Sequence, residues 1–435
     1  MSLAPPSRTR ATGLAICAMI LLSLAHGLGG GVLPAWPAGL CVWLIGTLLL
    51  RGIARFQKIQ VAVMGAIGLA GLGYGALRGD YHAWREVLEG NQSILAMLAT
   101  VSFLRLVAKS GGGPGERLTR GRGAIATTLF AVHLFGAVIN VSAAFVVGQR
   151  ISQDGSLTPL QAKVVTRAFV AAASWSPLFA SMAVVLHYVP DVTIARVVMV
   201  NLPLALAMLA FAAWDLRRDA AAPDFIGFPL HRDALTAPVT LSLLVLGLHA
   251  LPTGWPVLTV IVLAALACVA LLRAGRPWPE TRRLLWHHVD RELPRMGGEF
   301  ALFIGATLLA AGIGTAVAAH PLPLVVDPAR PAAGIPLLCL LVAVTLCGIH
   351  PVISIATLAS LFPPQLAAPN VLAVVALMAW SITLGTSPVS GTTLAMQGRF
   401  GIPSTRFLRW NLAYSLAALA LGCAVLLVAD YFGLA

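Results

Sequence analysis

The stretch GTSPVSGTTLAMQ, residues 385–397, places Gly, Ser, Thr and Pro between two long apolar segments. The apolar run VLAVVALMAW precedes it, and LAYSLAALALGCAVLLV follows after a short basic loop. Pro388 lacks a backbone N–H, and Gly385 and Gly391 favour departure from helical geometry. Backbone that leaves a helix inside a membrane exposes polar groups that lipid cannot satisfy. The stretch therefore predicts an interrupted membrane helix whose opened groups face protein or a water-filled cavity.

The composition places this stretch in a membrane protein. Of the 435 residues, 58% are hydrophobic and 10% are charged, and the mean hydropathy is +0.88. These values exclude an ordinary soluble domain and predict an all-α polytopic membrane protein. The basic stretch MSLAPPSRTRAT followed by an apolar run predicts an uncleaved first span. The cysteines lie in apolar segments without CxxC spacing, which is typical of small buried hydrophobes; they are Cys17, Cys41, Cys268, Cys339, Cys347 and Cys423.

Apolar segments of membrane-spanning length predict about 11 crossings. Two further apolar segments, 122–148 and 335–363, are interrupted by polar residues and are interpreted as re-entrant hairpins, which return to the side from which they entered. The predicted crossings are 13–34, 38–51, 59–77, 92–108, 163–189, 194–214, 236–252, 255–274, 297–319, 370–396 and 407–433.

The net charge of +13 follows this topology. With a cytoplasmic N-terminus, most of the 29 Lys and Arg residues fall in cytoplasmic loops, as the positive-inside rule requires. The rule holds only if 122–148 is not a crossing. We therefore expect a bacterial-type inner membrane protein with its C-terminus outside, loop 109–122 inside, loop 320–334 outside and no nucleic-acid partner. The basic residues outside this pattern are Arg78, Arg85 and Arg330 in outer loops and Arg105 and Arg196 near span ends.

A repeat runs through the chain. LFGAVINVSAAFV (134–146) aligns with LCGIHPVISIATL (346–358), which matches Gly136 with Gly348 and Ser142 with Ser354. Further along, ASWSPLFASMAVV aligns with GTSPVSGTTLAM, so that the two Ser-Pro pairs coincide. Upstream, YHAWREVLEG resembles WHHVDRELPR, and each predicts an interfacial helix. The order and the nearly constant offset of these matches indicate two related halves.

The second half has an odd number of predicted crossings, which inverts it relative to the first. Inverted repeats with interrupted helices are typical of secondary transporters, whose sites lie between the halves near the midplane. The predicted organisation is a cytoplasmic tail 1–12, a first repeat 13–214 with hairpin 122–148 and broken helix 163–189, a linker 215–235, and a second repeat 236–435 with hairpin 335–363 and broken helix 370–396.

In this layout the chain resembles the ion transporter superfamily, in particular the divalent anion:sodium symporters and their arsenite-pump-like and citrate-carrier relatives. The resemblance covers most of the chain in layout, but in motif it is confined to the two hairpins and two broken helices. Symporters of that family carry Ser-Asn-Thr at each hairpin tip, whereas this chain has Asn140 and Ser142 at the first tip and Ser354 and Thr357 at the second. The resemblance implies a homodimer with a static scaffold and a moving transport domain.

The candidate site residues lie in the hairpins and broken helices, where hydroxyls, amides and opened backbone can face a ligand. For substrate binding they are Asn140, Ser142, Ser174, Ser176, Ser354, Thr357, Thr386, Ser387, Ser390, Thr392 and Thr393. For ion coupling they are Asn140, Gly136, Gly348, His350 and Gly385, and the helix-breaking residues are Pro177, Pro388 and Gly391. Helix–helix hydrogen bonding is the alternative role for the Ser and Asn residues.

No Asp, Glu or Lys lies in the core of either predicted hairpin or broken helix. Because proton antiporters of the superfamily usually need a buried carboxylate, this absence argues against Na⁺/H⁺ exchange. It favours an anion held by amide and hydroxyl donors, with Na⁺ or a proton on His350 as the coupling ion. No cofactor or metal cluster is expected. His133 is expected to be a core histidine, Glu299 and Asp430 to be interfacial, and Arg105 to extend toward the cytoplasmic surface.

Two other classes of protein stay open at this point. An anion channel or an oxyanion exporter would use the same hairpins, although paired inverted hairpins suit alternating access better than a continuous pore. An intramembrane serine hydrolase would pair Ser387 or Ser354 with a histidine, and His350 lies four residues before Ser354. The sequence has no GxSxG elbow and no acid to orient the base, so we expect a transporter and not an enzyme.

Overall fold

The computed structural model describes residues 6–30, 32–107, 118–189, 191–229, 236–319, 330–361 and 368–434. This part of the chain is almost entirely helical, and its only strands are β1 (Thr119–Arg120) and β2 (Ile226–Gly227), which pair antiparallel. The predicted all-α polytopic class is confirmed. The predictions for residues 1–5, 109–117, 230–235, 320–329 and 362–363 lie outside the described residues.

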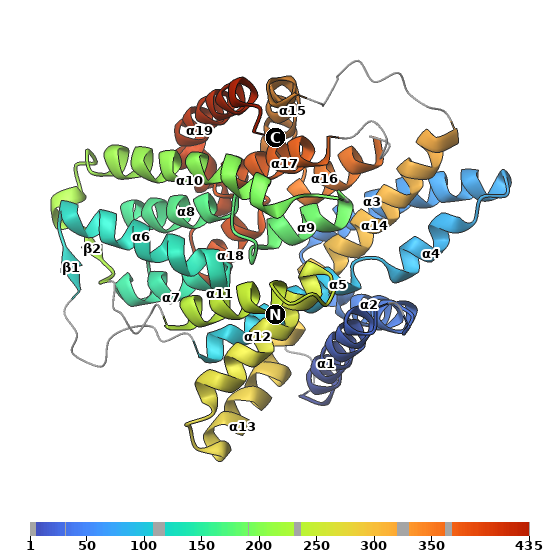
Figure 1. The fold of residues 1–435 in the computed structure, drawn as a ribbon. Helices are drawn as coiled ribbons and strands as arrows, with labels where there is room; N and C mark the ends of the chain where they lie inside the picture. Colours follow the sequence, from blue (N-terminus) through green and yellow to red (C-terminus); the bar gives the residue numbers. More distant parts are fainter. Residues whose placement is uncertain are drawn as a thin grey trace. The chain divides into compact units, whose positions relative to one another are not determined.

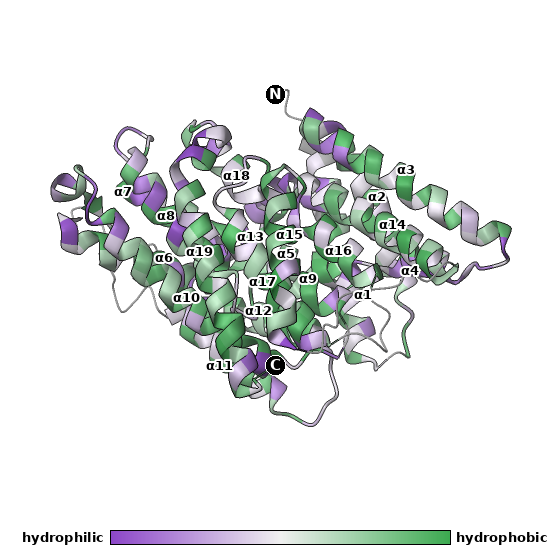
Figure 2. Ribbon diagram, turned by 90° about the horizontal axis from the view of Figure 1, so that it is seen from above, coloured by the Kyte–Doolittle hydropathy of each residue, from purple (hydrophilic) through white to green (hydrophobic). Residues whose placement is uncertain are grey.

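Seven helical segments of the described chain are long and apolar enough to cross a membrane. Shorter apolar helices of 10–17 residues accompany them. Figure 2 shows hydrophobic residues along most helices and hydrophilic residues mainly at helix ends and loops. The seven segments are Thr9–Leu28, Arg55–Leu77, His82–Leu106, Arg122–Ile139, Ile194–Leu216, Trp278–Ala319 and Ser404–Phe432.

The chain divides into two compact units, and each draws on both predicted repeats. Unit 1 comprises Met1–Ala108, Val239–Pro323 and Ala356–Leu361, and unit 2 comprises Lys109–Pro238, Leu324–Ile355 and Phe362–Ala435. Both predicted broken helices and the first hairpin fall in unit 2, which therefore contains most of the candidate site residues.

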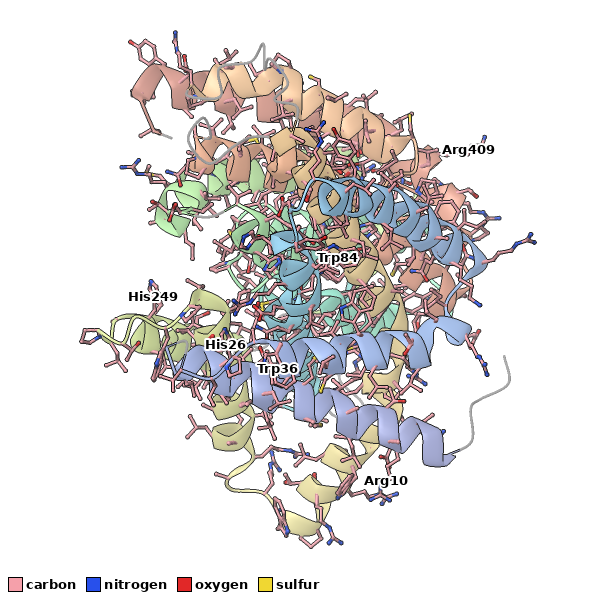
Figure 3. All side chains as sticks on the ribbon, turned by 90° about the vertical axis from the view of Figure 1, so that its right-hand side faces the viewer. Arg10, His26, Trp36, Trp84, His249 and Arg409 are labelled. Atoms are coloured by element: carbon pink, nitrogen blue, oxygen red, sulfur yellow. The ribbon has the colours of Figure 1, made fainter. Side chains whose placement is uncertain are left out.

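Unit 1 is built from apolar helices and short helical turns. They are α1 (Pro6–Leu28), α2 (Trp36–Leu49), η1 (Leu50–Gly52), α3 (Arg55–Leu77), α4 (His82–Glu89), α5 (Gln92–Ser102), η2 (Phe103–Leu106), most of α11 (Thr236–His249), α12 (Val257–Arg273), α13 (Trp278–His287), η5 (His288–Glu292, a π-helix), η6 (Leu293–Met296) and α14 (Gly297–Ala319). The first predicted interfacial segment forms α4, and the second lies inside the continuous run from α13 to α14. Figure 3 shows Arg10 of α1 at the surface, where its guanidinium lies 4.6 Å from the centre of the Trp286 ring.

Glycines let α3 and α14 pack at backbone contact. A Cβ on Gly68 would lie 2.2 Å from the carbonyl oxygen of Leu308, and one on Gly71 would lie 2.2 Å from that of Gly312. Small residues are the usual means of close helix packing in membranes, where lipid is as apolar as the side chains. The close approach of this pair therefore depends on glycines at the contact.

Unit 2 contains the interrupted helices. Its first part has β1, α6 (Arg122–Ile139), α7 (Val141–Ile151), α8 (Pro159–Ala172), α9 (Ala180–Tyr188), α10 (Ile194–Leu216), η3 (Ala222–Asp224) and β2. Its second part has η7 (Pro331–Gly334), α15 (Ile335–Leu346), the start of α16 (Pro351–Leu361), α17 (Pro369–Leu384), α18 (Gly391–Phe400) and α19 (Ser404–Phe432). Helices α6, α8 and α10 lie side by side (Figure 1).

The start of α8 is held by a capping box and by the predicted linker. Thr158 caps the helix through the backbone N–H of Gln161, and the Gln161 side chain accepts from the backbone N–H of Thr158. The same amide donates to the carbonyls of Ile151 at 2.9 Å and Ile226 at 3.1 Å. The end of α7 and strand β2 are thereby tied to α8, so this part of the segment 215–235 is ordered structure.

Candidate functional site

The first interruption separates α8, which ends at Ala172, from α9, which begins at Ala180. The hydroxyl groups in it are bonded to nearby backbone. Ser174 Oγ donates to the Ala171 carbonyl at 2.9 Å, and Ser176 Oγ donates to the Ala137 carbonyl of α6. Ser176 Oγ also accepts from the backbone N–H of Leu178 at 3.2 Å, beside Pro177, which has no N–H to offer. These serines link the interruption to α6.

Asn140 forms the tip between α6 and α7 and closes the same interruption. Its backbone has φ of 53° and ψ of −143°, a conformation that residues other than glycine rarely adopt. Its Nδ2 donates to the Leu178 carbonyl at 3.0 Å, and its Oδ1 accepts from the Ala180 N–H at 3.1 Å. One side chain thus satisfies a carbonyl and an N–H that the broken helix leaves open. Ser142 follows on α7 and is buried.

His133 of α6 is satisfied on both ring nitrogens. Its Nδ1 lies 3.3 Å from the Ala168 carbonyl, and its Nε2 lies 3.2 Å from the indole Nε1 of Trp175. The carbonyl needs a donor and the indole needs an acceptor, so this network assigns the neutral ring with its proton on Nδ1. This arrangement fits the expected core histidine.

The second interruption separates α17, which ends at Leu384, from α18, which begins at Gly391. Ser390 caps α18: its Oγ accepts from the Thr393 N–H at 3.1 Å and donates to the Leu384 carbonyl at 2.6 Å. Thr393 Oγ1 donates to the Ser387 carbonyl at 2.7 Å. Thr392 is buried in the first turn of α18, while Pro388 is half-buried and Gly391 is exposed.

The hydroxyl of Thr386 bonds to α19. Thr386 Oγ1 lies 2.5 Å from Ser415 Oγ, and Ser415 Oγ donates to the Ile382 carbonyl at 2.8 Å. Since Ser415 uses its hydrogen on that carbonyl, Thr386 is the donor of the pair. The hydroxyl of Thr386 is therefore already used in joining the interruption to α19.

Ser387 differs from these neighbours. Its side chain is fully buried, and its Oγ has no hydrogen-bond partner among the described residues. A buried hydroxyl without a partner costs about 1–3 kcal/mol. Such a group at the interruption of a membrane helix is a candidate for contact with a ligand.

A buried arginine holds the side chain that hydrogen-bonds to the second interruption. Asn411 of α19 donates from Nδ2 to the Gly385 carbonyl at 2.8 Å and accepts at Oδ1 from Arg167 Nε at 3.0 Å. Arg167 lies on α8 with 4% of its surface exposed, and it pairs with Asp215 of α10 at 2.5 Å. Its guanidinium also donates to the Trp410 carbonyl and lies 4.5 Å from the centre of the Tyr414 ring. The charge of Arg167 is therefore compensated by Asp215, and its N–H donors bond to protein groups and not to a ligand.

This group was missed in the sequence-based prediction. Arg167 falls inside the predicted broken helix 163–189 but is not among the predicted site residues, and the structure places it within α8, which runs from Pro159 to Ala172. An ionisable residue within a membrane-embedded helix is by itself a signal of function or of buried pairing. Its partners Asp215 and Asn411 carry no such signal in the sequence.

The two broken helices meet close to their interruptions. Ser381 of α17 donates from Oγ to the Val170 carbonyl of α8 at 2.8 Å. A Cβ on Gly385 would lie 3.0 Å from Val170 Cγ1, and one on Gly136 would lie 3.0 Å from the Phe169 ring. These two glycines, predicted for ion coupling, thus lie where helices pack closely.

The second hairpin tip lies between α15, which ends at Leu346, and α16, which begins at Pro351. Gly348 has φ of 105°, a conformation that favours glycine. His350 accepts at Nδ1 from the Val352 N–H at 3.2 Å, and its ring contacts Trp380 of α17. Ser354 Oγ is buried without a hydrogen-bond partner among the described residues. Thr357 falls in the part of α16 that belongs to unit 1.

The remaining charged candidates form ion pairs or lie at helix ends. Arg105 pairs with Glu292 at 3.1 Å and Arg330 pairs with Asp430 at 2.6 Å, while Glu299 is exposed in the first turn of α14. Within the described ranges, no three His, Cys, Asp or Glu residues are grouped as a metal site would need. No histidine nitrogen bonds to Ser387 Oγ or Ser354 Oγ, so the nucleophile–base contact of a serine hydrolase is not formed in this structure.

Lys163 and Asp219 form an ion pair beside the start of α8. Lys163 Nζ lies 2.5 Å from Asp219 Oδ2. Partial burial opposes the charge of Asp219, but hydrogen bonds from Lys163 and the Ala221 N–H, with the charges of Lys163 and Arg167, hold its pKa below the ordinary value. The pair fastens α8 to the turn after α10.

The fold resembles that of a solved transporter. The sequence matches no model of a known protein family and no curated protein. Among solved structures, the chain is similar to the YdaH transporter of Alcanivorax borkumensis, described as having an unusual topology. The two share 16% sequence identity with a TM-score of 0.50, over 86% of this chain and 98% of that chain. At this identity the similarity establishes the fold alone, which is that of a multi-pass membrane protein.

Proposed function

We propose that this protein is a secondary active transporter that moves a small anion, such as a carboxylate, across the inner membrane by alternating access. The single observation that carries the proposal is the second interruption, where the fully buried Ser387 Oγ lacks a partner beside the capped start of α18. Hydroxyls and backbone N–H groups at a broken helix are the usual means of binding an anion inside a membrane.

The arrangement of charges supports an anion over a cation. The buried cation nearest the interruption, Arg167, is already paired with Asp215, and the residues at the interruption are neutral. A neutral site rich in donors avoids the cost of burying an unpaired protein charge. Similarity to a transporter fold supports the same class of protein.

Coupling to Na⁺ or H⁺, an elevator-type movement and a homodimeric assembly belong to the same proposal. They come from the resemblance to the ion transporter superfamily. Carbonyl and hydroxyl oxygens at the interruptions are suitable ligands for Na⁺ as the coupling ion.

The experiment is a thermal-stability screen of the purified protein in detergent. Dicarboxylates, tricarboxylates, sulfonates and oxyanions are each tested in Na⁺ and in K⁺ at equal ionic strength. A ligand that binds only the folded state raises the melting temperature. At a concentration a hundred times its dissociation constant, it adds about 2.7 kcal/mol to the free energy of unfolding. We expect one anion class to raise it, and a shift that requires Na⁺ would identify Na⁺ as the coupling ion.

Uptake into proteoliposomes then separates a carrier from a channel. A carrier saturates with substrate concentration and shows counterflow, whereas a channel does neither. Absence of a melting shift with every anion, together with absence of counterflow, would refute anion transport.

A further inference from the structure

Trp380 of α17 has a buried donor that nothing in the described protein accepts. The residue is 4% exposed, and its indole Nε1 has no hydrogen-bond partner among the described residues. Two other indoles are paired: Trp43 Nε1 donates to the Val87 carbonyl and Trp175 Nε1 to His133, both at 3.2 Å. Since an indole N–H can only donate, a buried one needs an acceptor.

The ring of Trp380 contacts the second hairpin tip. Its centroid lies 5.9 Å from that of His350, at an interplanar angle of 87°. His350 Nδ1 accepts the Val352 N–H, so in the neutral ring the proton is on Nε2. The imidazole therefore presents a second N–H donor beside the indole.

Ser354 adds a hydroxyl one helical turn after His350. Its backbone N–H lies 3.5 Å from the His350 carbonyl, which places it on the first full turn of α16. Its Oγ is buried and, within the described residues, has no partner. The hydroxyl therefore lies within one helical turn of the tip that carries the imidazole.

The three groups share one chemical character. An indole N–H and an imidazole Nε2–H only donate, and a serine hydroxyl can donate as well. A set of donors selects an acceptor, and hydrogen bonds to a charged acceptor are about twice as strong as neutral ones. A carboxylate offers about four acceptor positions, which is enough for all three donors.

We propose that Trp380 is a substrate-binding residue whose indole N–H, together with His350 and Ser354, binds a carboxylate group of the transported anion. This inference rests on the proposed anion transport and adds a specific binding subsite to it. A weak N–H···π contact between the two rings is the competing explanation, and it would not involve a ligand.

The test uses the full-length protein in detergent, with succinate and citrate as probes in Na⁺ and in K⁺. Trp380→Phe keeps the ring and removes the N–H, and Trp43→Phe is the matched control because its paired indole lies in unit 1. We expect the dissociation constant from the melting-temperature titration to rise about tenfold or more in Trp380→Phe. We expect Trp43→Phe to bind like wild type.

Two further variants keep the test decisive if Trp380→Phe fails to fold. His350→Asn retains a good capping side chain while it removes Nε2–H, and Ser354→Ala removes only the hydroxyl; we expect weaker succinate and citrate binding in each. Wild-type affinity in every variant that folds would overturn the subsite and leave anion transport standing. If neither the probes nor the wider anion screen shifts the wild-type melting temperature, and counterflow is absent as well, the proposed transport itself fails.

Discussion

The two interruptions in unit 2 are supported in different ways. At the first, the tip residue Asn140 bonds directly to the Leu178 carbonyl and the Ala180 N–H. At the second, the Gly385 carbonyl is bonded by Asn411 of α19, which Arg167 of α8 holds in turn. The first interruption is closed by its own hairpin, whereas the second is closed by other helices.

The two also differ in what they leave unpaired. The hydroxyls of Ser174 and Ser176 are bonded to protein, while Ser387 Oγ, Ser354 Oγ and Trp380 Nε1 have no partner among the described residues. Buried polar groups are normally satisfied. The comparison supports the proposal that the second hairpin and interruption, and not the first, provide donors for a ligand.

Arg167→Met should have the largest effect, because it tests the support of the second interruption. Removing one partner of a buried pair leaves the others unsatisfied, so we expect a loss of about 3 kcal/mol of stability. Chemical or thermal denaturation in detergent measures it. Arg167→Lys keeps the charge but not the forked geometry, and it should lose less. A melting temperature equal to wild type in Arg167→Met would show that this support is dispensable.

Asn140→Ala should cause the second-largest loss of stability. The substitution leaves the Leu178 carbonyl and the Ala180 N–H without their partner and keeps a Cβ at a positive φ that favours glycine, at a combined cost of about 2–3 kcal/mol. Asn140→Gly removes the amide without the backbone strain, so it should be the more stable of the two. Equal melting temperatures for both variants would exclude a backbone contribution.

Two serines of the second interruption, three residues apart, allow a matched comparison of a bonded and an unpartnered hydroxyl. Ser390→Ala removes the cap of α18 and should cost about 1 kcal/mol. Ser387→Ala removes an unpartnered buried hydroxyl, so stability without ligand should stay the same or rise, while anion binding and transport fall. Melting curves with and without the anion measure both effects. A large loss of ligand-free stability in Ser387→Ala would mean that its hydroxyl has a structural role.

The smallest effect concerns the ion pair at the start of α8. Because the pKa of Asp219 is lowered by folding, its contribution is present above the unfolded pKa and is lost as pH falls through the folded pKa. Asp219→Asn should therefore cost less than about 1 kcal/mol at neutral pH, and the cost should disappear as the pH falls through the folded pKa of Asp219. Melting temperatures of the two proteins across this range should converge in acid; a constant difference would contradict the pairing.

The interruptions show how far sequence reasoning extends. Pro388 and the surrounding Gly and Ser predict that the helix breaks, because a missing N–H and a missing Cβ act locally. Sequence reasoning placed Asn140 at the first tip but could not identify its partners, which lie in another helix. It did not single out Arg167, since the residue's burial and pairing depend on α10 and α19, which contact α8 in the fold.

The amino-acid sequence by itself determined that this protein is an all-α membrane protein with interrupted helices, because hydropathy and helix-breaking residues act over a few neighbours. Only the tertiary structure decided which polar groups are hydrogen-bonded within the protein and which stay unpaired. Ser176 and Ser387 occupy matching positions of the predicted repeat, yet one bonds to α6 and the other has no partner among the described residues. The difference arises because a buried hydroxyl is satisfied only by groups that packing brings within hydrogen-bond distance.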